Sequence, residues 1–198
     1  MEVELKPVIL LFGKMSIFEQ DVKEYAGFAA EFDSPIRHAL VNDDPCDAIR
    51  RIATKYHVAR NFWRRFDEML GITRYQPVVR ALGAYPPNIG INPIEAVLRL
   101  NHDLKQIYHR DVLSASSKFL WFAWGRGIII YDSQALTTLR TRSPDLQTKD
   151  YSNYCAAWKV LFSEYSEEIA RECARQGVTS ELWFHERVFD WYLWRSGK

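Results

Sequence analysis

Helix start signals followed by apolar residues at helical spacing recur along this chain and constrain its fold more than any other feature. Asp44-Pro45 and Asn92-Pro93 each place a capping side chain before a proline, a pair that favours a first helical turn. Ile94, Val97 and Leu104 follow the second signal at helical spacing. Such patterns predict helices over about 45–56, 59–70, 75–82, 93–108, 118–124, 133–142, 149–176 and 179–194. Only 3–12 reads as strand-like, so we expect an all-α fold.

Length and composition limit the classes of protein that this chain can represent. Its 198 residues, 47% of them hydrophobic, suffice for one domain over 1–198 with a sizeable core. The longest apolar runs, 8–12 and 119–124, fall far short of the ~20 residues that span a bilayer. The acidic start Met1–Glu4 is unlike a secretory signal, and the three cysteines form no CxxC pair. We therefore expect a cytoplasmic monomer with no membrane segment, metal or cofactor.

Lys118 is the first candidate for a chemical role, in the stretch 114–142. It stands at the predicted start of an apolar helix, beside Phe119, Trp121 and Phe122. The positive end of the helix dipole and burial would both lower the pKa of its amine. A neutral amine is the form that acts as a nucleophile. The alternative is a lysine that extends from a surface turn into solvent.

Asp132 is the second candidate, because it follows the apolar run 128–131 directly. Its ordinary role would be to cap the helix that begins at Ser133, but a capping carboxylate can direct its other oxygen into a cavity. The path between Lys118 and Asp132, with Gly125-Arg126-Gly127 inside it, is hairpin-like and can bring both to one site. The turn 114–117 adds backbone amides and the hydroxyls of Ser116 and Ser117, which suit a phosphate.

The charges of the chain are segregated, although the net charge is only +1. The stretch 50–65 (RRIATKYHVARNFWRR) contains basic and aromatic residues and no acidic ones, whereas acidic residues collect on the predicted helix 149–176. A basic, aromatic face suits phosphate contacts, and a solvated helical face is the alternative. The candidate DNA-contacting arginines are Arg60, Arg64, Arg126, Arg140 and Arg142. A near-neutral net charge disfavours only tight, non-specific binding along DNA.

The motifs SSK at 116–118 and IIIYDS at 128–133 resemble the catalytic region of helix-hairpin-helix DNA glycosylases. The similarity is closest to their bacterial 8-oxoguanine-glycosylase-like branch and covers roughly 92–194. In that family a lysine opens the helix after the DNA-binding hairpin and an aspartate follows an apolar stretch, which are the positions of Lys118 and Asp132. The tail 185–194 (HERVFDWYLW) is similar to the closing helix. The resemblance implies a compact helical domain of this type, with a divergent hairpin because 109–117 contains no glycine.

The resemblance also implies a mechanism, with double-stranded DNA carrying a modified base as the partner. Asp132 would stabilise the oxocarbenium ion that forms as the N-glycosidic bond breaks. Lys118 would then attack C1′ and permit strand cleavage, or Asp132 would activate water and leave an abasic site. The base would be flipped into a pocket of aromatic and histidine side chains. The candidates for this pocket are Trp121, Phe122, Tyr131, Trp183, Phe184 and His185.

An oxidised purine is the default substrate that the resemblance implies. A bulkier base, such as glucosylated hydroxymethylcytosine in phage DNA, would also suit the divergent hairpin and the tryptophan-rich pocket, in a role in phage defence. Two other classes of protein fit the same features. One is a non-catalytic helical DNA-binding protein, and the other is a helical interaction protein whose Trp and Tyr residues bind a protein partner.

Overall fold

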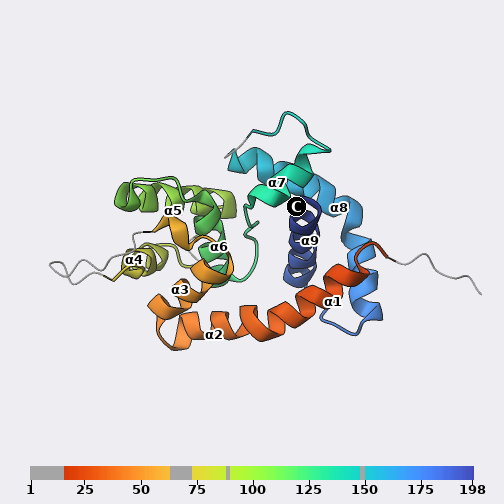
Figure 1. Ribbon diagram of the computed structural model, residues 1–198, viewed down its shortest axis with the longest axis horizontal. Helices are drawn as coiled ribbons and strands as arrows, with labels where there is room; N and C mark the ends of the chain where they lie inside the picture. The colour runs from red at the N-terminus through yellow and green to blue at the C-terminus, as the bar shows by residue number, and fades with distance from the viewer. Residues whose placement is uncertain (1–15, 63–72, 88–89, 148–149) are drawn as a thin grey trace, which may run out of the picture.

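A computed structural model describes residues 16–62, 73–87, 90–147 and 150–198, and within these ranges the chain is helical with no strand (Figure 1). The predicted all-α fold class is therefore confirmed. The strand-like stretch 3–12, Arg64 and most of the predicted helix 59–70 lie outside the described residues. The elements are α1 (Glu19–Phe28), η1 (Ala29–Asp33), α2 (Ser34–Asn42), α3 (Pro45–Lys55), η2 (Ala59–Asn61), α4 (Gln76–Gly83), α5 (Pro93–Tyr108), α6 (Leu113–Trp124), α7 (Ser133–Arg140), α8 (Tyr151–Arg175) and α9 (Leu182–Ser196).

Asp44 and Asn92, two of the predicted capping residues, begin their helices as expected. The Asp44 carboxylate accepts a hydrogen bond from the backbone N–H of Cys46 at 2.9 Å. The side-chain oxygen of Asn92 accepts from the N–H of Ile94 at 2.8 Å at the start of α5. Each cap satisfies an N–H that has no partner within its own helix, which fixes where the helix begins.

The helices form two groups joined along one side (Figure 1). The first contains α3 to α6, and the second contains α7, α8 and α9. The continuous run α1–η1–α2 borders both groups, since α1 packs on α8 and α9 while α2 packs on α3 and α6. One cluster of buried apolar residues extends through both groups, with Trp121 and Trp158 as its largest members.

The run from α1 to α2 was not predicted from the sequence. Pro35 lacks a backbone N–H and usually interrupts a helix, yet here it stands in the first turn of α2. The preceding segment η1 is a π-helix, whose wider turn absorbs the change in hydrogen bonding before the proline. Asp33, the last residue of η1, is thereby placed in the core at 1% exposure.

The prediction that α6 begins at Lys118, after a cap at Ser116 or Ser117, is wrong. The helix begins at Leu113, because side chains outside it satisfy the first amides. Asn101 on α5 accepts from the N–H of Val112 at 2.9 Å, and Asp111 accepts from the N–H of Leu113 at 3.2 Å. Lys118 therefore lies in the second turn of the helix. Within the described ranges, no helix combines the length and apolar character needed to cross a membrane.

Candidate active site

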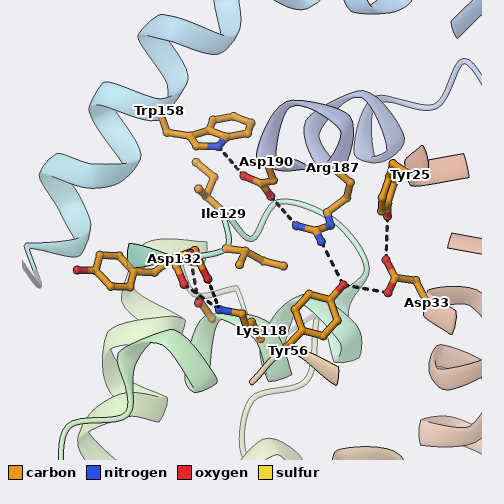
Figure 2. A network of polar contacts seen from close by, with 12 residues as sticks. Tyr25, Asp33, Tyr56, Lys118, Ile129, Asp132, Trp158, Arg187 and Asp190 are labelled. Atoms are coloured by element: carbon orange, nitrogen blue, oxygen red, sulfur yellow. Dashed lines mark hydrogen bonds and ion pairs between the residues drawn. The ribbon is translucent and has the colours of Figure 1, made fainter. Parts of the chain in front are cut away.

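Lys118 and Asp132, the two predicted catalytic residues, meet in the structure (Figure 2). The Nζ of Lys118 donates to Oδ2 of Asp132 at 3.2 Å. It also donates to Oγ of Ser114 at 2.7 Å and to the carbonyl oxygen of Tyr131 at 3.2 Å. The three N–H groups of an ammonium thus have three acceptors. The Lys118 side chain is 3% exposed and that of Asp132 is 25% exposed, so the alternative in which the lysine extends into solvent is wrong.

Asp132 is held in place by the extended segment that precedes it. Oγ of Ser117 accepts from the N–H of Tyr131 at 3.0 Å, which ties this segment to α6. On the other side, two tyrosines of α8 donate to the carbonyls of Ile129 and Ile130, at 2.6 Å and 3.0 Å. Oδ1 of Asp132 caps α7 through the N–H of Gln134 at 2.9 Å, which leaves Oδ2 for Lys118. The carboxylate therefore caps α7 with one oxygen and binds Lys118 with the other.

Burial lowers the pKa of the Lys118 amine, and the nearby Asp132 carboxylate opposes this effect. A lowered pKa of Lys118 agrees with the prediction, but one of its two predicted causes is wrong. Because Lys118 lies in the second turn rather than at the helix start, the helix dipole is not the reason for the shift. Two charges that the sequence did not predict to lie near it act as well: Arg187 lowers the pKa and Asp190 raises it.

A second set of buried polar side chains crosses the core beside Lys118 and Asp132 (Figure 2). Nη1 of Arg187 donates to Asp190 at 2.8 Å, and Asp190 also accepts from Trp158 Nε1 at 2.7 Å. Nη2 of Arg187 donates to the Tyr56 hydroxyl at 3.1 Å, and that hydroxyl donates to Asp33 at 2.9 Å. Arg187 lies within the tail 185–194, and a charged pair three residues apart inside an apolar helix was the available sequence signal.

The turn that precedes the helix of Lys118 contains no glycine. The chain reverses between α5 and α6 over 109–112, and His109 adopts the left-handed conformation at φ 55° that glycine usually takes. Histidine is among the residues that tolerate this conformation. The next residue, Arg110, donates to the carbonyl oxygen of Arg60 at 3.1 Å. The predicted DNA-contacting residue Arg60 is exposed here, beside an arginine of the turn that sequence reasoning missed.

The other predicted DNA-contacting residues lie in different surroundings. Ser116 and Ser117 are fully buried, and their hydroxyls donate to the backbone carbonyls of Val112 and Ser114. The amides of Ala115 and Ser116 donate to the Val112 carbonyl, so these groups are not available to a phosphate. Arg126 is exposed in the turn after α6. Arg140 donates to the carbonyl oxygen of Leu146 at 2.7 Å. Arg142 lies 4.0 Å from Glu164 of α8, so its charge faces the acidic helix rather than a basic surface.

Four of the six predicted pocket residues form a chain of ring contacts. Trp121 packs on Phe122 at 4.9 Å and on Trp183 at 6.5 Å between ring centroids, and Trp183 packs on Phe184 at 5.8 Å. Trp183 is half-buried and the other three are buried. Tyr131 packs instead on Tyr154 of α8 at 4.9 Å.

His185 is buried, which lowers its pKa, and its Nε2 has no hydrogen-bond partner. The guanidinium of Arg37 stacks on Trp121 and Trp183, with its Cζ 5.1 Å and 5.5 Å from the ring centroids. Arg37 lies on α2, a segment for which the sequence predicted no role.

No group of His, Cys, Asp or Glu side chains within the described ranges could hold a metal ion. A small cavity lies at the start of α5, where Asn92, Gly127 and Lys159 are among its lining residues. Neither Lys118 nor Asp132 contributes to its walls.

The chain was compared with known proteins in three ways. No protein-family model, no curated protein and no solved structure matches it. The function must therefore be argued from the site itself.

Proposed function

We propose that this chain is a DNA glycosylase of the helix-hairpin-helix type, which flips a modified base out of double-stranded DNA and cleaves its N-glycosidic bond. The observation that carries the proposal is the contact between Lys118 Nζ and Asp132 Oδ2. The two residues are 14 apart in sequence, and the lysine is almost fully buried. A buried, paired lysine is costly to the fold, and ionisable groups in such environments cluster at functional sites.

The partial exposure of Asp132 supports its assignment as the catalytic carboxylate. Its side chain is 25% exposed, so a sugar can approach it from outside while Lys118 lies beneath it. Breaking the glycosidic bond develops positive charge at C1′, which a nearby carboxylate stabilises. If the Lys118 amine then attacks C1′, the product is a Schiff base that allows strand cleavage. If water attacks instead, the product is an abasic site.

Two exposed arginines at the turn before α6 support DNA as the partner. Arg110 lies in the turn between α5 and α6 and donates to the backbone of Arg60, and this turn leads directly into the helix that bears Lys118. A phosphate at this turn would meet arginine side chains. Of the predicted base-pocket residues that form the chain of ring contacts, only Trp183 is half-buried, and its ring is the one on which a flipped base can stack.

A substrate screen tests this proposal. Purified protein would be incubated with duplexes that carry one oxidised purine or one glucosylated hydroxymethylcytosine, and hot alkali would then reveal abasic sites as strand breaks. Breaks at the modified position, and none in the unmodified duplex, are expected. Activity on the glucosylated base would assign a role in phage defence, and activity on the oxidised purine a role in repair.

Two negative results would point to the rival functions. Binding to duplex DNA at low salt without release of any base would favour a non-catalytic DNA-binding protein. If the protein neither releases a base nor binds DNA at low salt, the helical interaction protein is the better interpretation.

A further inference from the structure

We propose that Ser114 is a positioning residue that relays a proton from the buried Lys118 ammonium to water and so leaves Asp132 ionised. The use of this relay in catalysis rests on the proposed function, whereas the proton path itself requires no DNA. Ser114 lies one helical turn before Lys118 on α6, and its Oγ is the nearest of the three acceptors, at 2.7 Å from Nζ. No role follows for Ser114 from the sequence beyond the serine-rich turn.

The need for a relay follows from the burial of the amine. The Lys118 side chain is 3% exposed, and its Nζ has three oxygen acceptors, one for each N–H group of an ammonium ion. An ammonium has no lone pair, so it must lose a proton before it can attack a carbon atom. Because Nζ is enclosed, that proton has to leave through one of the three acceptors.

Comparison of the three acceptors selects the serine. The Tyr131 carbonyl can accept a hydrogen bond but has no proton of its own to pass on. Asp132 can take the proton, but it would then lose the negative charge that stabilises an oxocarbenium ion. A hydroxyl can accept one proton and release another, which leaves its own charge unchanged.

The surroundings of Ser114 allow the second half of the relay. The residue is partly exposed, whereas its neighbours from Ala115 to Leu120 are buried. Among the described residues, no protein group accepts the Ser114 hydroxyl proton, so that proton can be donated to water. In the relay one N–H bond of Lys118 breaks and its proton binds Oγ. The former hydroxyl proton passes to water, and the amine keeps the electron pair.

Nuclear magnetic resonance of the protein labelled with ¹⁵N-lysine tests the relay without DNA. The Nζ signal of Lys118 would be assigned by its loss in Lys118→Arg, and the exchange of its protons with water would be measured from pH 6 to 8. We expect Ser114→Ala to slow this exchange by at least about tenfold and Ser114→Thr to restore it. Ser133→Ala is the matched control, since Ser133 is an exposed serine beside Asp132, and it should leave the exchange unchanged.

The direction of the effect separates a relay from a merely structural role. A serine that only packs or fills space would, on removal, admit water and speed the exchange. An unchanged or faster exchange in Ser114→Ala, or failure of Ser114→Thr to restore it, would therefore overturn the relay. Should Ser114→Ala fail to fold, the exchange rate of the Lys118 protons would be measured for wild type and Ser114→Thr in mixtures of H₂O and D₂O. A relay moves two protons together and a direct path moves one, so the dependence of the rate on the D₂O fraction distinguishes them.

A measurement of activity on DNA complements the measurement of proton exchange, and the two can fail independently. On any substrate found in the screen, we expect Ser114→Ala to slow borohydride trapping of Lys118 more than it slows base release. If no DNA substrate is found but the exchange slows as expected, the relay stands and the proposed function fails. If base is released normally but the exchange is unaffected, the proposed function stands and the relay fails.

Discussion

Arg187 and Asp190 form an ion pair inside the core, with Nη1 of the arginine 2.8 Å from Oδ2 of the aspartate and side chains that are 5% and 10% exposed. Burial raises the pKa of Asp190, and the neighbouring Arg187 guanidinium opposes that effect. The pair lies between α8 and the Tyr56–Asp33 contact, so it joins the two groups of helices beside the candidate site.

Removal of Arg187 should therefore destabilise the fold strongly. Arg187→Met leaves Asp190 without its cation in the core, and we expect a loss of about 3–5 kcal/mol in the free energy of unfolding. Arg99→Met is the control, because the side chains of Arg99 and its partner Glu95 are 57% and 49% exposed. That variant should lose about 0–1 kcal/mol. Urea unfolding measures both, and equal losses would contradict the distinction.

Glu186 should make stability depend on pH. Burial raises its pKa from 4.5 to about 7. In that range the folded state binds more protons than the unfolded chain, so stability falls as pH rises from about 4.5 to about 7. Glu186→Gln removes the ionisable group and should be more stable than wild type by about 1–2 kcal/mol above pH 7, a figure reduced for the partial exposure of the side chain. Near pH 4 the two proteins should be equal.

Urea unfolding at several pH values checks this dependence. Glu167→Gln provides the control, because the Glu167 side chain is exposed on α8. A gain for Glu186→Gln that is the same at every pH would show that the effect comes from packing rather than from ionisation.

Gly125, at the end of α6, should resist substitution for two reasons that can be separated. Its φ of +78° disfavours any side chain, and a Cβ there would overlap Nη2 of Arg37. Gly177 also has a positive φ, +68°, but has open space around it. Gly177→Ala should therefore cost about 1 kcal/mol, and Gly125→Ala about 1 kcal/mol more because Arg37 must leave its stack on the tryptophans.

A double-mutant comparison isolates the Arg37 contribution. In an Arg37→Ala background the two glycine substitutions should cost the same. If the excess cost of Gly125→Ala persists without Arg37, the contact with the arginine is not its cause.

The parts of the structure that the sequence predicts are those set by neighbouring residues. Asp44, Asn92 and Asp132 each cap a helix by accepting from the backbone amide two residues later. Because both partners lie within three consecutive residues, the sequence alone indicates the contact. The pairing of Lys118 with Asp132 was also within reach, because the glycine turn at 125–127 reverses the chain between them.

The parts that the sequence does not predict depend on distant partners. The start of α6 is set by Asn101, 11 residues before the amide that it caps. Arg187 donates to Tyr56, 131 residues away, so its role in the core cannot be inferred from its own helix. The course of the chain through Pro35 depends on a π-helix, for which the sequence shows no pattern.

The central claim is that Asp132 carries the base-release chemistry, and one measurement tests it most directly. Single-turnover base release would be compared between Asp132→Asn and Asp44→Asn on the best substrate of the screen. Both aspartates cap a helix through an amide two residues ahead at 2.9 Å, so the pair separates catalysis from capping. We expect Asp132→Asn to slow release by about 10²-fold or more and Asp44→Asn to keep the wild-type rate. A wild-type rate in Asp132→Asn would contradict the proposed function of the site.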